Sequence, residues 1–376
     1  MNDASLAARL PFELVGDFIF IRVSIAESKP LDFIFDTGAG TTVINSGTIQ
    51  RLGLTPGRSV SASGAAGTIE VETLRDITID TGDVALENLK VQASDLSHLE
   101  RAIGRRIDGI IGYHLLRKRI VEINYDAAEL RVHDRKRFRY RVSGQRIPLK
   151  ARRHAYLKAA LDFGDGGVIP ARFIIDTGAG IALGLATPFV EKHDAIDRLG
   201  ATYSRSSSGL SKERPTVFRA RVPKVRIDRF TFDAAPASLY QVSQGFFSER
   251  RQAGVIGNVI LKRFNIVFDY GGNQSWWEPN RTFSDTPFLI DCSGLSLALD
   301  ADMQRVLIDA VRSDSPAFNA GLRAGDEIRS VDSEPVSKSP LHVVEERLSQ
   351  DGTTVELQIS RDGVPRNASL ELVRPY

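Results

Sequence analysis

Short apolar runs, separated by clusters of Gly, Asp, Asn and Ser, recur along the chain up to about residue 285. Such runs, bounded by turn-forming residues, are typical of β-strands joined by tight turns. A helical pattern is brief and is favoured only at 187–199 and 45–53. This part of the chain is therefore expected to be all-β. The expected strands lie at 18–21, 33–35, 77–79, 121–123, 156–159, 173–175, 225–227 and 266–268.

Two sequence blocks each occur twice, in the same order along the chain. Residues 32–40 read DFIFDTGAG, and residues 172–180 read RFIIDTGAG. Farther on, residues 110–125 align without a gap to residues 255–270. This period is too long for a solenoid repeat, so the pattern predicts two homologous lobes. The expected domains are lobe one at 1–143, lobe two at 144–286 and a third domain at 290–376.

The composition is that of an ordinary globular protein. Of the 376 residues, 42% are hydrophobic and 26% are charged, and the net charge of +2 gives no reason to expect a nucleic-acid partner. The lone cysteine, Cys292, excludes an intrachain disulfide and a thiolate metal site. The six histidines have no metal-ligand spacing, so we expect neither a metal nor a cofactor. No apolar run is long enough to span a membrane.

The first ten residues have neither a basic region nor a long apolar region, so the sequence as written shows no signal peptide. A cytoplasmic location is expected if the sequence is complete. A periplasmic or secreted location is expected if a signal has been trimmed.

Each copy of the first block places an aspartate, Asp36 or Asp176, at the end of an apolar strand and follows it with Thr-Gly. Glycine permits a sharp turn and the close approach of another backbone. If a pseudo-two-fold axis relates the two loops, their carboxyl groups meet and share one proton. One carboxylate can then act as a general base on a water molecule while its protonated partner donates to a carbonyl oxygen.

Over residues 10–285 the sequence resembles the aspartic peptidase clan, in particular bacterial retropepsin-like members with a pepsin-style bilobal arrangement. The resemblance implies two β-barrel lobes with a catalytic cleft between them, and it makes Asp36 and Asp176 the catalytic pair. It also implies that Thr37 and Thr177 lock the two loops together by crossed hydrogen bonds. The implied supporting positions are Gly38, Gly178, Ile111, Gly112, Ile256 and Gly257.

The clan covers its cleft with a mobile hairpin, the flap. The best match is the Gly- and Ser-rich stretch 61–67, which lacks the tyrosine of pepsins, and its lobe-two counterpart is 204–209. The expected substrate-binding residues of the flap are Ser63, Gly64, Ala65, Ala66 and Gly67. Ala39 and Ala179 stand where pepsins have a hydroxyl residue, and this resemblance to retroviral enzymes implies activity at milder acidity.

The third domain resembles a PDZ domain, because residues 315–328 follow the pattern S-P-A-x-x-A-G-L-x-x-G-D-x-I. It implies an α+β domain that binds an extended peptide at a sheet edge. We also expect a helix at 340–349 and two strands around 362–363. The expected peptide-binding loop is Gly294, Leu295, Ser296 and Leu297. The alternative for this domain is a packing module with no ligand.

Other classes share parts of these motifs. Actin-like kinases contain Asp-Thr-Gly, but they alternate strands with long helices, a pattern that this sequence lacks. The Gly-Ala-Gly stretches lack the third glycine of a dinucleotide loop. The basic run at 131–146, a candidate nucleic-acid patch, is better explained as an exposed connecting strand. Its basic residues include Arg135, Lys136, Arg137, Arg139 and Arg141.

The sequence therefore predicts an endopeptidase that hydrolyses an extended peptide beneath the flap, with apolar residues beside the cut. Because one chain carries both aspartates, a monomer is expected to suffice. The alternative is a peptide-binding adaptor without catalysis that uses the cleft and the C-terminal domain.

Overall fold

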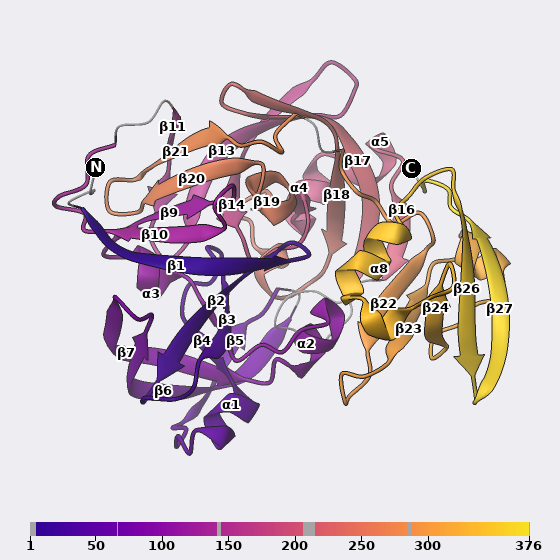
Figure 1. Cartoon of the computed structure of the whole chain (residues 1–376). Helices are drawn as coiled ribbons and strands as arrows, with labels where there is room; N and C mark the ends of the chain where they lie inside the picture. Colours follow the sequence, from indigo (N-terminus) through magenta and orange to yellow (C-terminus); the bar gives the residue numbers. More distant parts are fainter. Residues whose placement is uncertain (1–4, 66, 141–143, 206–214, 285–286, 376) are drawn as a thin grey trace.

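A computed structural model describes residues 5–375, apart from 66, 141–143, 206–214 and 285–286. Strands make up 47% of the chain and helices 14%, and the strands form three sheets, which confirms the predicted fold class. Figure 1 shows the C-terminal domain, in orange and yellow, beside the two β-rich halves of the chain. No described helix is long and apolar enough to cross a membrane.

A six-stranded segment of the largest sheet joins the two halves of the chain. At its centre β9 pairs with β20 in antiparallel register, and Glu122 lies opposite Val267. These two residues occupy the same position of the sequence repeat, so a pseudo-two-fold axis passes between the strands. The order is β11 (Gln145–Pro148), β21 (Gln274–Pro279), β20 (Phe264–Asp269), β9 (Ile120–Asn124), β10 (Glu129–His133) and β1 (Leu6–Val15).

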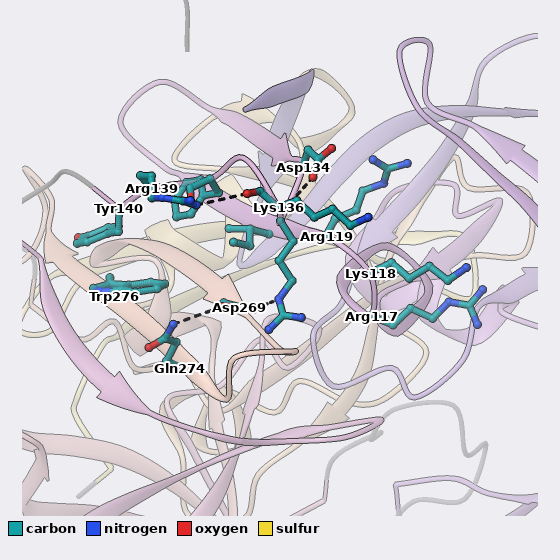
Figure 2. Close-up of a pocket in the computed structure, with 13 residues that line it drawn as sticks. Arg117, Lys118, Arg119, Asp134, Lys136, Arg139, Tyr140, Asp269, Gln274 and Trp276 are labelled. Carbon is teal, nitrogen blue, oxygen red and sulfur yellow. Dashed lines mark hydrogen bonds and ion pairs between the residues drawn. The ribbon is translucent and has the colours of Figure 1, made fainter. Parts of the chain in front are cut away.

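The basic run is strand only at its ends, residues 131–133 of β10 and 145–146 of β11, and the described residues between them do not form the expected connecting strand. The strand β10 ends at His133, and the chain then turns, with Arg137 N and Phe138 N donating to Asp134 O. Figure 2 shows this segment lining a pocket together with Trp276 of β21, on which Tyr140 stacks at 4.5 Å between ring centroids. The clustered like charges favour a solvated turn over a paired strand. Arg141 lies outside the described residues.

The first half of the chain folds into a closed barrel, because β6 pairs back onto β2. The hairpin of β5 (Ser59–Ser63) and β6 extends from this barrel, and α1 (Ser46–Arg51), α2 (Ser97–Ile103) and α3 (Tyr113–Leu116) lie in its connections. The barrel order is β2 (Phe18–Ile25), β3 (Leu31–Phe35), β8 (Gly109–Ile111), β4 (Val43–Asn45), β7 (Ala85–Ser94) and β6 (Thr68–Asp80).

The second half repeats this topology, with β17 pairing back onto β13. Its order is β12 (Lys150–Ala151), β13 (Ala155–Asp162), β14 (Val168–Asp176), β19 (Gly254–Gly257), β15 (Leu183–Leu185), β18 (Phe230–Gln241), β17 (Thr216–Ile227) and β16 (Thr202–Arg205). The connections hold α4 (Thr187–Lys192), α5 (Ala195–Arg198), the 3-10 turn η1 (Phe246–Ser248) and α6 (Asn258–Leu261).

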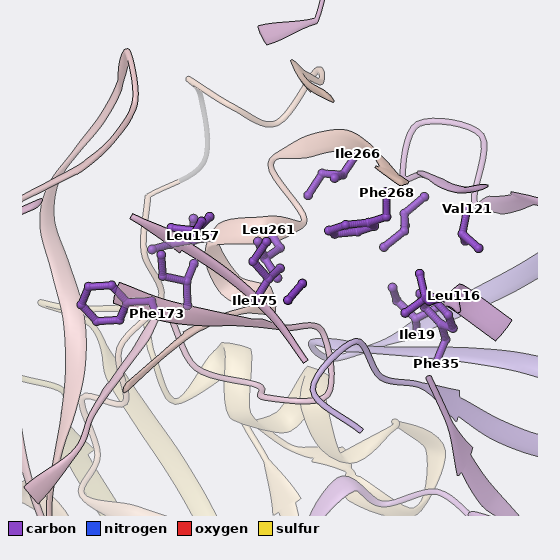
Figure 3. Close-up of a cluster of buried hydrophobic side chains, with 14 of the residues drawn as sticks. Ile19, Phe35, Leu116, Val121, Leu157, Phe173, Ile175, Leu261, Ile266 and Phe268 are labelled. Atoms are coloured by element: carbon purple, nitrogen blue, oxygen red, sulfur yellow. The ribbon is translucent and has the colours of Figure 1, made fainter. Parts of the chain in front are cut away.

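One apolar core runs through both halves and fixes the strands that carry the aspartates. Phe35 and Phe173 are fully buried, and Figure 3 shows them at opposite ends of this cluster. Both β3 and β14 pair in parallel with a neighbour, β8 and β19 respectively. Strands buried on both faces read as continuous apolar runs, which is why these two blocks stand out in the sequence.

The C-terminal domain has its own core, in which Cys292 is buried. Its α7 (Pro316–Asn319) begins at Ser315, whose hydroxyl accepts from Phe318 N, and Pro316 fits the first helical position. The expected helix is α8 (Leu341–Arg347), and Asp362 and Gly363 form the turn between the last two strands. The strands are β22 (Leu295–Leu299), β23 (Val306–Val311), β24 (Glu327–Val331), β25 (Glu334–Pro335), β26 (Thr354–Arg361) and β27 (Val364–Glu371), with η2 (Val336–Lys338) before α8.

Truncation of Phe264 tests the shared core. Its ring is fully buried and lies 5.0 Å from the Trp277 ring and 4.8 Å from the Phe230 ring. We expect Phe264→Ala to lower the free energy of unfolding by about 3–5 kcal/mol, because it leaves a cavity. Both tryptophans lie in β21, so urea unfolding followed by tryptophan fluorescence reports on this region. Val168→Ala, at an exposed position, should change the free energy of unfolding by under about 0.5 kcal/mol. Equal losses in the two variants would contradict a core position for Phe264.

Candidate active site

The two Asp-Thr-Gly loops emerge from β3 and β14 at the centre of the molecule. Asp36 N donates to Ile111 O at 2.8 Å, and Asp176 lies opposite Gly257 in the parallel pairing of β14 with β19. Each aspartate is thus fixed by the second sequence block of its own half. Ile111 and Ile256 are fully buried beneath the loops.

Thr37 and Thr177 join the two loops by four hydrogen bonds. Thr37 Oγ1 accepts from Thr177 N at 3.1 Å and donates to Ile175 O at 2.8 Å. Thr177 Oγ1 accepts from Thr37 N at 3.0 Å and donates to Phe35 O at 3.0 Å. Both threonines are fully buried, so each hydroxyl satisfies backbone groups that have no access to water.

Each carboxyl group lies against the glycine of the opposite loop. A Cβ atom on Gly38 would lie 2.5 Å from Asp176 Cγ, and one on Gly178 would overlap the Asp36 carboxyl group. Any larger residue would therefore push the two loops apart. The two carboxyl groups are hydrogen-bonded to each other.

The backbone around each aspartate supplies further donors. Asp36 Oδ1 accepts from Gly38 N at 2.6 Å and Ala39 N at 3.1 Å, and Asp176 Oδ1 accepts from Gly178 N at 3.0 Å. Burial raises the pKa of Asp36, while the hydrogen bonds from Asp176 and the backbone oppose that rise. Burial raises the pKa of Asp176 well above its usual range, and the Asp36 charge raises it further. The pair therefore holds one proton across a range of pH in which isolated carboxyls have lost theirs.

Gly112 and Gly257 occupy positions where a side chain does not fit. A Cβ atom on Gly112 would overlap Asp36 O, and one on Gly257 would overlap Ile181 O. The glycines of the second sequence block are thus required by the close approach of the Asp-Thr-Gly loops.

A cavity of about 1280 Å³ lies over the carboxyl pair. Its wall includes Tyr240, Phe246 and Phe247, which sequence reasoning missed because their segment shows no motif. Tyr240 and Phe247 stack at 3.7 Å between ring centroids. His154, also missed, donates from Nδ1 to Gly38 O across 2.9 Å, and burial lowers its pKa.

The expected flap residues form the tip of the β5–β6 hairpin. Gly64 N donates to Gly67 O, and Ser63, Gly64 and Ala65 line the cavity. The tip is bonded to the opposite half, because Phe246 N donates to Gly64 O at 2.9 Å and Phe247 N donates to Ala65 O at 3.0 Å. Ala66 and residues 206–209 of the expected lobe-two counterpart lie outside the described residues.

The expected peptide-binding loop precedes and enters β22, the edge strand of the C-terminal sheet. Gly294 N donates to Asp291 Oδ2 at 2.8 Å, and Leu295 N donates to Ser293 Oγ at 3.1 Å. Leu295, Ser296 and Leu297 line the cavity that holds the carboxyl pair, and α2 of the first half contacts β22.

Comparison with known families assigns two parts of the chain. A family model described as aspartyl protease matches residues 21–115, and one described as PDZ domain matches residues 289–372. The two matches support a retropepsin-like protease with a C-terminal PDZ domain. The protease match ends before residue 176, so the second aspartate rests on the repeat and the geometry above. No curated protein matches the chain.

Within the described residues, no group of three or more His, Cys, Asp or Glu side chains is placed to hold a metal ion.

Replacement of Thr37 tests the link between the loops. Thr37→Val keeps the shape but leaves Thr177 N and Ile175 O without partners, so the free energy of unfolding should fall by about 2–3 kcal/mol. Thr37→Ser, which keeps the hydroxyl, should lose under half as much. Chemical unfolding followed by tryptophan fluorescence measures both, and equal losses would show that the hydroxyl contributes nothing.

The raised pKa of Asp176 predicts a pH-dependent stability. The unfolded chain loses this proton near its ordinary pKa of 3.8, whereas the folded chain keeps it to higher pH. The free energy of unfolding should therefore fall as pH rises from that value through the folded pKa. Asp176→Asn removes this loss, so its stability relative to wild type should increase between pH 3 and pH 7.

The matched control is Asp165→Asn, because the Asp165 carboxylate is exposed and its hydrogen bond with Arg198 lowers its pKa. That variant should show no relative gain as pH rises. A flat difference between wild type and Asp176→Asn would show that the pKa of Asp176 is unchanged on folding.

Proposed function

We propose that the protein is an aspartic endopeptidase in which Asp36 and Asp176 activate one water molecule. The observation that carries the proposal is the pair of hydrogen-bonded carboxyl groups, each packed against the glycine of the opposite loop. A pair that shares one proton supplies a base and an acid in the same site. Water addition to a peptide carbonyl requires both.

The two aspartates have similar surroundings. Both carboxyl groups are buried, and each accepts backbone hydrogen bonds, Asp36 Oδ1 from Gly38 N and Ala39 N and Asp176 Oδ1 from Gly178 N. The pair therefore shares one proton. The protonated carboxyl group donates toward the scissile carbonyl oxygen, and the charged one takes a proton from the attacking water. Thr37 and Thr177 position the pair.

The substrate is an extended peptide that crosses the cavity beneath the flap. Ser63, Gly64 and Ala65 of the flap line the cavity above it, and a peptide backbone that replaces the Phe246 N and Phe247 N donors can bond to Gly64 O and Ala65 O. Tyr240 and Phe247 form part of an apolar wall, which supports a preference for apolar side chains beside the cut. One chain carries both aspartates, so a monomer suffices. The PDZ domain, whose edge strand reaches the same cavity, recruits the substrate or a partner peptide.

The alternative is an adaptor that binds peptides without cutting them. A binding groove gains nothing from a pair of desolvated carboxyl groups, because burying them costs stability that only their chemistry explains.

Digestion of unfolded casein between pH 4 and pH 7 separates the two functions. Wild type should release peptides, whereas Asp36→Asn and Asp176→Asn should each lose at least about 100-fold in rate, since each removes one half of the proton exchange. The matched control is Asp165→Asn on the exposed surface, which should cut at the wild-type rate. Absence of cutting by wild type, with retained peptide binding, would establish the adaptor.

A further inference from the structure

The two ends of the cavity are related by the repeat, and the strand register identifies the matching residues. In lobe one Phe20 pairs with Ile34, and in lobe two Tyr156 pairs with Ile174. Ile34 and Ile174 hold the same position of the first sequence block, so Phe20 matches Tyr156. Three residues earlier, in the turn that precedes each strand, Asp17 therefore matches Arg153.

The second sequence block gives another matched pair. Its ungapped alignment places Arg117 at the position of Lys262, and each residue directly follows a short helix, α3 or α6. The neighbouring glycines support the match of Asp17 with Arg153, because Gly40 and Gly180 hold the same position of the first sequence block. A Cβ atom on Gly180 would lie 3.6 Å from Asp17 Cβ, and one on Gly40 would lie 3.5 Å from Arg153 Cβ.

At one end the matched side chains form an ion pair. Lys262 Nζ lies 2.7 Å from Asp17 Oδ1, and Asn258 Nδ2 donates to Asp17 O at 2.8 Å. Glu345 of the PDZ domain lines the cavity with Asp17, and burial and then the charges of Asp291 and Asp17 raise its pKa to about 7. The one matched cation at this end, Lys262, is therefore already neutralised by Asp17.

At the other end the same two positions hold two cations. Arg117 and Arg153 are exposed, both line the cavity, and neither makes an ion pair with a described residue. Both lie near His114, since burial and then the charges of Arg117 and Arg153 lower its pKa. The acid on this side, Glu249, is paired with Arg251 at 3.5 Å.

The positive charge continues outward from Arg117. Figure 2 shows the pocket that the basic run lines together with Trp276. Arg117, Lys118 and Arg119 lie along one side of this pocket and face the turn that carries Lys136. Asp269, one of two acids in that pocket, is paired with Arg135 at 3.0 Å. The field at this end of the cavity thus favours an anion.

We propose that Arg117 and Arg153 form an anion-binding subsite at one end of the catalytic cavity, which takes a carboxylate of the peptide being cleaved. The proposal rests on the proposed peptidase function. In this subsite a carboxylate of the substrate takes the place that the Asp17 carboxylate takes at the matching end of the cavity. The carboxylate comes from an Asp or Glu side chain or from a free C-terminus. Because Asp17 already neutralises Lys262 at the far end, neither matched position there offers a free cation, and the preference applies to one side of the scissile bond only.

The test uses twelve-residue amidated peptides built around a cut site mapped in casein. Each peptide carries Glu or Gln at one position, two to five residues before or after the cut, and kcat/KM is measured at low salt. For wild type, Glu at a position on one side should raise kcat/KM over Gln by about two- to fivefold, as expected for exposed ion pairs. A further Gln peptide, shortened to end with a free carboxylate at that position, tests the C-terminus as the source.

The kcat/KM values for the Glu and Gln peptides are measured on the same sample of each variant. Their ratio therefore does not depend on how much of that sample is folded. Arg117→Gln and Arg153→Gln should bring the ratio close to one, whereas Arg153→Lys should keep most of it. The matched control is Arg152→Gln, since Arg152 is exposed beside Arg153 and does not line the cavity. A ratio near one at every position in wild type, or a full ratio in the Arg117→Gln/Arg153→Gln double variant, would overturn the subsite.

Binding separates this result from failure of the peptidase function. Fluorescence anisotropy of the same labelled peptides with Asp36→Asn protein, at 50 and 300 mM salt, requires no cutting. Tighter, salt-sensitive binding of the Glu peptide that disappears with Arg153→Gln would support the subsite even if wild type cuts nothing. Equal binding of the Glu and Gln peptides would overturn the subsite even if wild type is an active peptidase.

Discussion

Two carboxyl groups repel each other once both are charged, and this structure holds them together by bonds that do not involve the carboxyl groups. The crossed hydrogen bonds of Thr37 and Thr177 set the separation of the loops, and the buried strands beneath them resist any relaxation. The surrounding structure therefore offsets the free-energy cost of holding the two carboxyl groups in contact. Gly38 and Gly178 let the contact form, because any Cβ atom would occupy the space of the opposite carboxyl group.

Much of this arrangement could be predicted from the sequence, because it depends on local patterns that occur twice. The apolar strands that end at Asp36 and Asp176, their turns and the glycines beneath them are determined by nearby residues and by the repeat. The all-β fold and the PDZ domain followed from the same kind of pattern, and both are confirmed. The serine that caps α7 and the proline after it belong to a motif that is read directly from the chain.

The walls of the cavity could not be predicted in this way. Tyr240 and Phe247 become neighbours of the flap only when the second barrel closes, and their segment has no distinctive spacing. Long-range contacts of this kind depend on tertiary packing, which overrides local preference. The prediction of a strand for the whole basic run was wrong, because charge pattern alone does not distinguish a solvated turn from an exposed edge strand. The difference between Asp17 and Arg153 was likewise invisible until the strand register matched them.

The antiparallel contact between β9 and β20 has a consequence for how the halves assemble. Since each strand meets its own counterpart, an isolated first half would expose an edge that is complementary to itself. Two separate copies could then join only by a bimolecular encounter, whose yield depends on dilution. A covalent tether replaces that encounter by an intramolecular one, with an effective concentration on the order of millimolar. Duplication within one polypeptide thus makes assembly of the shared sheet independent of how much protein is present, and it frees the two halves to acquire different charges.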